Sequence, residues 1–242
     1  MPAVFVHGVP DTARVWRPLL AQLKRSDVVC LSLPGFGNRR PAGFHADKDS
    51  YAAWLLAELR KLDGPIDLVG HDWGSLLVTR VVSIAPPGLV RSWSGGGAPL
   101  DPGYVWHDTA QIWQTPGKGE ELMQMMSADL MAAGLAAQGI PPEEARETAQ
   151  LMDDEMKASI LTLYRSAIRV ADEWFADLKN VTAPGLVLWG ENDPYAAAHF
   201  GAKLAANTNA EFTPAPGAGH WYQIEKPVFV ADALSAFWAK HR

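Results

Sequence analysis

The sequence predicts an α/β fold, in which helices flank a mostly parallel β-sheet. Four short apolar runs, each followed by glycine or a turn, have the length and β-branched composition of strands buried on both faces: residues 3–6, 28–33, 66–69 and 186–189. Helical patterns alternate with these runs, and strands that are separated by helices form βαβ units with parallel pairing. We therefore expect helices at residues 16–23, 50–61, 76–84 and 228–240, and two weaker strands at 90–94 and 211–214.

The middle of the chain differs in pattern from its two ends. Between residues 99 and 180 no strand pattern appears, only helix-like stretches interrupted by Pro116-Gly117 and Pro141-Pro142. A length of 242 residues is compatible with a single α/β domain. We therefore predict a core formed by residues 1–98 and 181–242 and a helical cap formed by residues 99–180. Six of the seven methionines lie between Met123 and Met156, where they either line an apolar cavity or pack one helix against another.

Composition and charge exclude several classes of function. The formal net charge is −6 and no basic stretch is present, which argues against nucleic-acid binding. No apolar stretch approaches the ~20 residues that cross a bilayer, and Met1 is followed directly by a strand pattern without the features of a signal peptide. We expect a soluble cytoplasmic protein that does not bind membranes. The histidines lack metal-ligand spacing and the single cysteine, Cys30, lies in an apolar run as a buried thiol, so neither a metal nor an organic cofactor is implied.

The segment from residue 66 to residue 75 carries the strongest functional signal. An apolar strand pattern leads into Gly70-His71-Asp72-Trp73-Gly74, and a helix pattern follows. A sharp strand-to-helix turn exposes its central side chain above the sheet, and glycines two positions before and after it leave room for the neighbouring chain. Asp72 is therefore the predicted nucleophile. The alternatives are that Asp72 only caps the helix, or that Ser75, which lacks the flanking glycines, is the nucleophile.

The loop that follows the first strand, His7-Gly8-Val9-Pro10, is a candidate for one side of an oxyanion hole. The backbone N–H groups of Val9 and Trp73 are expected to face the Asp72 carboxyl, where they would stabilise the negative charge that develops when water attacks it. The imidazoles of His7 and His71 are expected to be structural.

Two further motifs predict an acid and a base. A strand pattern ends in Trp189-Gly190-Glu191-Asn192-Asp193, and His220 lies in a glycine-containing loop beyond the last strand. The chain order of nucleophile, acid and histidine is the order expected of a sheet with a strand-turn-helix nucleophile. Asp193 would orient the His220 ring and stabilise its charged form. Glu191 is the competitor for this role.

Together these motifs resemble the epoxide hydrolase and haloalkane dehalogenase branch of the α/β-hydrolases. The matching segments are 7–10, 70–74, 189–193 and 219–221, and the resemblance spans nearly the whole chain, most weakly in the cap. It implies the α/β-hydrolase fold with a helical cap. It also implies that Asp72 attacks carbon to give an alkyl–enzyme ester, which water activated by His220 then hydrolyses. Family members usually begin with a β-hairpin before the His-Gly loop, whereas this chain starts at the strand, so a smaller sheet is expected.

The resemblance implies how an epoxide oxygen would be protonated. Epoxide hydrolases usually supply tyrosines from the cap, and segment 161–165 resembles the one that carries such a residue, here Tyr164. Thr109 stands where a second tyrosine is expected, and Tyr104 is a nearby candidate to replace it. The alternative is that Tyr164 only packs within the cap.

A halide leaving group would need hydrogen-bond donors in place of an acid. Trp73 follows the nucleophile, and its indole N–H can only donate. Dehalogenases often pair this residue with an asparagine after His-Gly, where this chain has Val9, or with a tryptophan of the cap, for which Trp106 and Trp113 are candidates. These tryptophans and Thr109 are expected to line the substrate pocket.

We therefore expect a cofactor-independent hydrolase that opens epoxides to diols, with a small apolar organic molecule and water as its substrates. Haloalkane dehalogenation is the main alternative, and ester hydrolysis is another. A catalytically idle homologue that binds a small molecule is the alternative of a different class. The joint presence of Asp72, Asp193 and His220 argues against it, because binding alone needs no acid–base pair.

Overall fold

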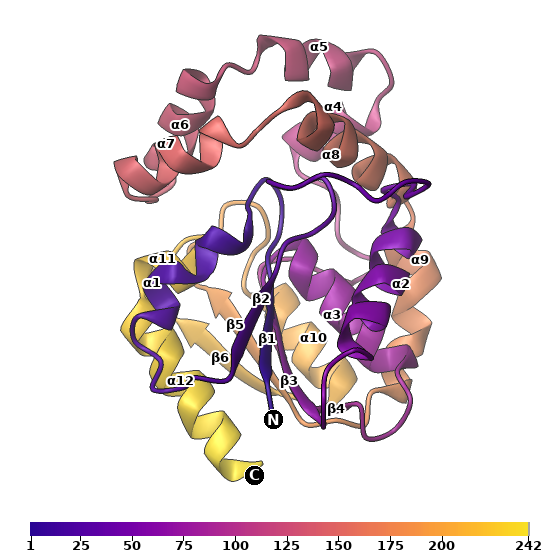
Figure 1. Ribbon diagram of the computed structural model, residues 1–242, viewed down its shortest axis with the longest axis vertical. Coiled ribbons are helices and arrows are strands. Elements are labelled where there is room, and N and C mark those ends of the chain that lie inside the picture. The colour runs from indigo at the N-terminus through magenta and orange to yellow at the C-terminus, as the bar shows by residue number, and fades with distance from the viewer. Residues whose placement is uncertain (242) are drawn as a thin grey trace.

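A computed structural model describes residues 1–241 and contains one six-stranded sheet in the order β2-β1-β3-β4-β5-β6 (Figure 1). All five pairs of neighbouring strands are parallel. The strands are β1 (Ala3–Val6), β2 (Val28–Leu31), β3 (Ile66–Gly70), β4 (Val90–Gly95), β5 (Gly185–Gly190) and β6 (Glu211–Ala215). The predicted α/β fold with its smaller sheet is confirmed, and each predicted strand is present.

Strand β2 differs from the prediction in its length and burial. It ends at Leu31, not at residue 33, and all four of its residues are only half-buried. The reason is its position, because β2 forms the edge of the sheet and pairs only with β1, while β1, β3 and β5 are buried throughout. Cys30 lies on this edge strand and is half-buried, so the prediction of a fully buried thiol was wrong. Burial still raises the pKa of Cys30 to about 11, which keeps the thiol protonated at neutral pH.

Side chains of the strands alternate between two apolar layers. Val4 and Val6 of β1 pack into a cluster with α2 (Lys48–Leu59), α3 (Trp73–Ile84) and α10 (His199–Thr208). Ala3 and Phe5 point to the other face and pack with α1 (Arg17–Leu20), α11 (Tyr222–Glu225) and α12 (Pro227–Lys240). Figure 1 shows the two layers, with α1, α11 and α12 on one side of the sheet and α2 and α3 on the other.

The first predicted helix, residues 16–23, is shorter and begins differently. A 3-10 turn, η1 (Ala13–Trp16), comes first, and α1 contains only the four residues that follow it. The Thr12 hydroxyl accepts a hydrogen bond from Arg14 N, so that helical structure begins before residue 16, the predicted start. Pro18 lies in the first turn of α1, a position that proline favours. The other predicted helices are present with small shifts. Helices α2, α3 and α12 begin directly after Asp47, Asp72 and Lys226, one to three residues before the predicted starts.

The segment between β4 and β5 contains helices and no strand within residues 99–180. Its elements are α4 (Asp108–Gln114), α5 (Lys118–Met125), α6 (Ala128–Ala137), α7 (Pro142–Gln150), α8 (Asp154–Ser166), α9 (Val170–Trp174) and η2 (Phe175–Asn180). Helices α4 to α8 lie beyond one end of the sheet, whereas α9 lies beside α2 and α3 (Figure 1). Lys48 and Glu173 form an ion pair at 2.6 Å, and Arg80 pairs with Asp177 at 2.5 Å. Residues 170–180 therefore pack against the helices on one face of the sheet. They do not belong to the group of helices, α4 to α8, that covers the end of the sheet.

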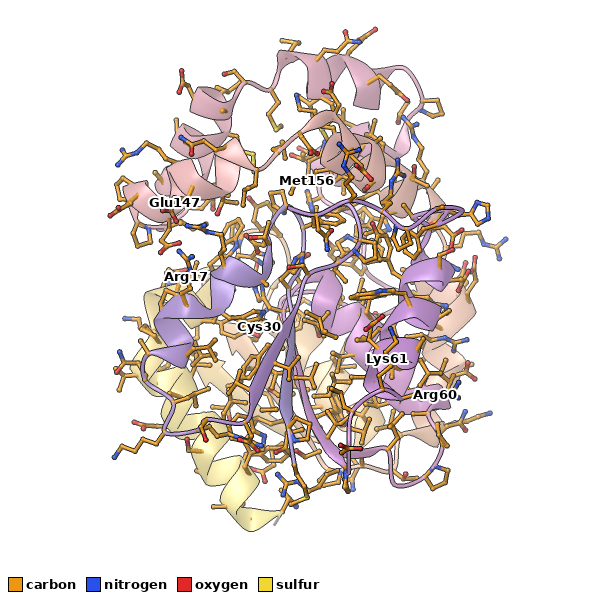
Figure 2. All side chains as sticks on the ribbon, viewed as in Figure 1. Arg17, Cys30, Arg60, Lys61, Glu147 and Met156 are labelled. Atoms are coloured by element: carbon orange, nitrogen blue, oxygen red, sulfur yellow. The ribbon has the colours of Figure 1, made fainter. Side chains whose placement is uncertain are left out.

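Helix α7 is tied to the core by charge. Glu147 forms ion pairs with two arginines, Arg14 of η1 and Arg17 of α1, and accepts a hydrogen bond from the second at 3.3 Å. Figure 2 shows Glu147 and Arg17 facing each other across the space between α7 and α1. The α6–α7 hairpin is thus held above the face that carries α1 and α11.

Candidate active site

Asp72 lies in the turn between β3 and α3, at the end of the sheet that α4 to α8 cover. Its backbone has φ 51° and ψ −125°, a conformation that residues other than glycine rarely adopt. A Cβ atom on Gly70 would clash with the Gly74 carbonyl, and one on Gly74 would clash with the Val6 carbonyl. The flanking glycines are therefore required by close backbone approach, and the turn they permit presents the Asp72 side chain to a cavity.

Two backbone N–H groups hold one oxygen of the Asp72 carboxylate. Val9 N donates to Oδ2 at 2.9 Å, and Trp73 N donates to the same atom. A Cβ atom on Gly8 would clash with the Asp72 side chain, so glycine is needed for the loop to approach. The other oxygen, Oδ1, lies 3.6 Å from His220 Nε2. Burial alone would raise the pKa of Asp72, but the hydrogen bond and charge of His220 and the Val9 N–H outweigh it and hold the pKa below its usual value.

The predicted acid and base are in contact. His220 Nδ1 lies 2.8 Å from Asp193 Oδ2, and both side chains are buried. The second oxygen of Asp193 accepts from the backbone N–H groups of Tyr195 and Ala196 at 2.9 and 3.2 Å. Glu191 is exposed and accepts from Gly217 N instead, so the structure places Asp193 against the imidazole.

The charge state of His220 depends on its two carboxylate neighbours. Burial lowers the pKa of an imidazole, but the charges and hydrogen bonds of Asp193 and Asp72 raise the pKa of His220 to about 10. The imidazole is therefore protonated at neutral pH as long as both carboxylates are ionised.

His7 and His71 are buried and bonded to backbone groups. His7 Nε2 accepts from Leu33 N at 3.0 Å, and its Nδ1 lies 2.8 Å from Gly8 O. His71 Nε2 lies 2.8 Å from the carbonyl of His220. Burial lowers the pKa of each to about 4, so both stay neutral. Ser75 is buried in the first turn of α3. Unlike Asp72, it does not line the cavity described next.

The cavity at Asp72 has a volume of about 90 Å³ and an aromatic wall. Of the four residues predicted to line the pocket, Trp106, Thr109 and Trp113 line this cavity and Trp73 does not. Tyr164, the predicted acid, and Tyr104 line it as well. The ring of Trp73 is buried behind this wall, 5.4 Å from the Tyr164 ring and 6.1 Å from that of Trp106. The Tyr104 hydroxyl donates to the carbonyl of Tyr195 at 3.1 Å and is thus already occupied.

Several residues of the site were not singled out in the sequence, among them His107, Tyr195 and Asp11. Tyr195 lines the cavity, and its ring stands edge-on to His220 with centroids 4.9 Å apart. Asp11 is buried beside the His-Gly loop and accepts from Trp221 Nε1 at 3.0 Å. Burial raises the pKa of Asp11 to about 7. Tyr195 and Asp11 are each close in sequence to a recognised motif, two positions after Asp193 and one after Pro10, and that proximity is the signal that could have identified them.

Comparison with known proteins identifies the family. The sequence model described as the alpha/beta hydrolase family matches residues 3–233. The chain belongs to the alpha/beta hydrolase family. Within residues 1–241 of this hydrolase no group of three acidic, histidine or cysteine side chains is arranged to hold a metal ion. The same residues contain no helix long and apolar enough to cross a membrane.

Curated relatives of this hydrolase have different activities. The chain is 28% identical to the dihydrolipoyllysine-residue acetyltransferase component of an acetoin cleaving system from Pseudomonas putida, over 99% of this chain but only 64% of that protein. It is 27% identical to (E)-2-((N-methylformamido)methylene)succinate hydrolase from Acinetobacter baylyi, over 84% of this chain and 77% of that protein. It is 26% identical to mouse epoxide hydrolase 3, over 97% of this chain and 69% of that protein.

Solved structures agree on the fold. An esterase from Thermogutta terrifontis superimposes with a TM-score of 0.80 at 19% identity, covering 100% of this chain and 91% of the other. The haloalkane dehalogenase DbeA from Bradyrhizobium elkani gives a TM-score of 0.76 at 22% identity, covering 99% and 91%. At these identities the likeness concerns the architecture alone.

Proposed function

We propose that this hydrolase opens epoxides to diols with Asp72 as its nucleophile. The observation that carries the proposal is the asymmetry of the Asp72 carboxylate. Oδ2 is occupied by the N–H groups of Val9 and Trp73, while Oδ1 faces His220 in the cavity. One oxygen is thus available to attack, and the other already lies where negative charge would develop in the next step.

In the first step Oδ1 of Asp72 forms a bond to an epoxide carbon, and the C–O bond of the ring breaks. Asp72 is ionised at neutral pH, so this attack needs no base. Tyr164 protonates the departing oxygen and regains its proton from solvent water. Burial, together with the negative charge of Asp72, raises the pKa of Tyr164 well above its usual value, so the hydroxyl is present as a proton donor. General-acid help of this kind contributes about 10²–10⁴ in rate.

In the second step water hydrolyses the ester. Esterification removes the charge of Asp72, so His220 loses one of the two carboxylates that raise its pKa. Its pKa falls, and the neutral imidazole takes a proton from water that adds to the ester carbon. The N–H groups of Val9 and Trp73 stabilise the oxyanion, and the loss of one such donor typically costs ~2.7–4 kcal/mol. Asp193 stabilises the imidazolium.

The relatives and the helical segment support this assignment. The similarity to mouse epoxide hydrolase 3 extends over 97% of the chain. We propose that the predicted cap comprises the part of residues 99–180 that precedes Val170, in which α4 and α8 contribute Thr109, Trp113 and Tyr164 to the cavity wall. The aromatic wall suits a small apolar substrate.

Haloalkane dehalogenation is the second candidate, and one observation favours it. The indole N–H of Trp113 is buried and has no hydrogen-bond partner within residues 1–241, and that of Trp73, also buried, has the Tyr164 hydroxyl as its neighbour. Two such donors near Tyr164 could bind a halide, which leaves as a stable anion and needs no acid. The same Asp72 and His220 would perform the displacement and the hydrolysis.

A substrate panel separates the candidates. Purified protein is incubated with styrene oxide and with 1-bromobutane, and diol and bromide are measured. Diol formation supports the proposal. Bromide release without diol assigns the dehalogenase reaction, and release of neither product would favour the idle binding homologue. A single turnover in H₂¹⁸O with enzyme in excess tests the ester: ¹⁸O must enter Asp72, and label that appears only in the product would exclude a covalent intermediate.

A further inference from the structure

A second cavity opens beside the catalytic one, beneath α6. It has a volume of about 270 Å³, against about 90 Å³ at Asp72. We propose that this apolar chamber binds the hydrocarbon chain of the substrate, and that the physiological substrates are terminal epoxides carrying a long unbranched alkyl chain. The substrate class rests on the proposed function, whereas the binding of an alkyl chain does not.

The two cavities are contiguous. Five residues line both of them: Pro10, Thr109, Trp113, Tyr195 and Trp221. Pro10 belongs to the loop that carries the oxyanion hole, and Tyr195 and Trp221 belong to the loops of the acid and the base. Thr109 and Trp113 belong to α4. Thr109 is the smallest side chain of the set after Pro10, and a bulkier residue there would obstruct the passage. A chain attached to the carbon that reacts with Asp72 can therefore continue into the chamber.

The lining of the chamber is mostly apolar, with Thr109 and Gln138 among its polar side chains. Its characteristic side chains are Met126, Leu130, Met131, Leu135 and Met152, and no charged side chain lines it. The cavity on the opposite side of the aromatic wall is lined by Asp101, Arg169 and Asp172 and would not favour a hydrocarbon. Methionine side chains are flexible and polarizable, so they adapt to chains of different lengths. The chemistry of the walls thus assigns the alkyl chain to the α6 side.

Helix α6 leaves space for this chain. Leu130, Gly134 and Gln138 follow one another at intervals of four residues and line the chamber along one face of the helix. A Cβ atom built on Gly134 meets no atom within 4 Å. Gly134 and Gln138 are exposed and Leu130 is 60% exposed, so the chamber is open to solvent along this helix. Glycine destabilises a helix interior relative to alanine, and here it keeps the centre of the face open.

The test compares chain lengths in wild type and in a plugged variant. Gly134→Phe places a ring at the chamber. Ala133→Phe is the matched control, because Ala133 is exposed on the same helix, as Gly134 is, but does not line the chamber. For 1,2-epoxydecane against 1,2-epoxybutane we expect wild type and Ala133→Phe to favour the longer substrate at least about tenfold in kcat/KM, since each buried methylene contributes about fourfold. Gly134→Phe should remove this preference. Equal kcat/KM values in wild type, or a preference retained in Gly134→Phe, would overturn the proposal.

A binding measurement keeps the test independent of epoxide hydrolysis. Calorimetric titration with 1-decanol and 1-butanol needs no turnover. Tighter binding of decanol, by about tenfold or more, that disappears in Gly134→Phe supports the chamber even if no epoxide reacts, in which case only the proposed reaction has failed. Equal affinities in wild type would reject the chamber. If Gly134→Phe lowers the helical circular dichroism signal, Thr109→Trp, which closes the passage, serves as the second variant. It should reduce turnover of 1,2-epoxydecane more than turnover of 1,2-epoxybutane. Equal losses for the two substrates would count against the passage.

Discussion

His220 Nε2 lies 3.6 Å from Oδ1 of Asp72, with the imidazole held from its other side by Asp193. The base therefore faces the oxygen that would carry the ester and not the oxygen that occupies the oxyanion hole. Water activated by His220 would approach the ester carbon from the side of the cavity. In the proposed mechanism the order of the two chemical steps follows from this arrangement, because His220 can lose its proton and act as a base only after Asp72 has lost its charge.

Removal of the base should trap the intermediate. In His220→Gln the first step remains, because Asp72 attacks without a base, and the second step fails. Incubation with substrate, digestion and mass spectrometry should show the mass of one substrate added to the peptide that contains Asp72. The double variant Asp72→Ala/His220→Gln is the control and should carry no adduct. An adduct on another peptide would rule out Asp72 as the nucleophile.

The acid can be assigned by comparing two tyrosines of the cavity. Tyr164→Phe should slow the opening of styrene oxide by about 10²–10⁴ and leave any displacement of bromide nearly unchanged. Tyr104→Phe is the matched control, because the Tyr104 hydroxyl already donates to the Tyr195 carbonyl and is expected to contribute much less. Similar losses for epoxide and bromide in Tyr164→Phe would show that this tyrosine acts by packing.

The two chemical steps should differ in pH dependence. The pKa of Asp72 lies below its usual value and that of Tyr164 well above it, so alkylation should be flat from pH 6 to 9. Ester hydrolysis needs neutral His220, so its rate should rise with pH through a pKa below the value of about 10 that holds while Asp72 is ionised. Rapid-quench single turnovers measure both rates. An alkylation rate that rises along the same curve as hydrolysis would mean that His220 acts before the ester forms.

Asp11 should make stability depend on pH. Burial raises its pKa from 3.8 to about 7, so the folded state binds more protons than the unfolded chain between these values, and stability falls as pH rises through that window. Asp11→Asn retains an acceptor for Trp221 and removes the buried charge. Its free energy of unfolding should exceed that of wild type by about 2 to 4 kcal/mol more at pH 8 than at pH 3.5. Urea titrations at the two pH values measure the difference, and parallel behaviour of the two proteins would show that Asp11 is not the titrating group.

The sequence alone specifies the parts of the fold that depend on local pattern. All six strands were predicted, four as short apolar runs and two as weaker strands, since the inner strands of a parallel sheet are buried on both faces. The turn at Asp72 was predicted because its glycines are required by close backbone contacts. The half-burial of β2 could not be predicted, because it follows from the order of strands in the sheet and not from composition. Residues 170–180 have the same helical pattern as the preceding helices. Their ion pairs with α2 and α3 and the packing of Val170, Trp174 and Leu178 in the core place them beside the sheet.

The candidate site shows the same division. Asp72, Asp193 and His220 lie in loops whose geometry is fixed by strand ends, so motif order was enough to bring them together. Tyr195 and Asp11 acquire their positions from contacts with residues distant in sequence, such as Trp221, which pattern analysis does not reveal. The cavity beneath α6 likewise depends on how the α6–α7 hairpin is held by Glu147 and Arg17.

Helices α4 to α8 all lie in the connection between β4 and β5, whereas Asp72 precedes this connection and Asp193 and His220 follow it. Natural variation can therefore redraw the walls around a substrate without disturbing the groups that react with it. An engineer could use the same partition: exchange of residues 108–166 for the equivalent stretch of a relative would transplant selectivity onto an unchanged reaction centre.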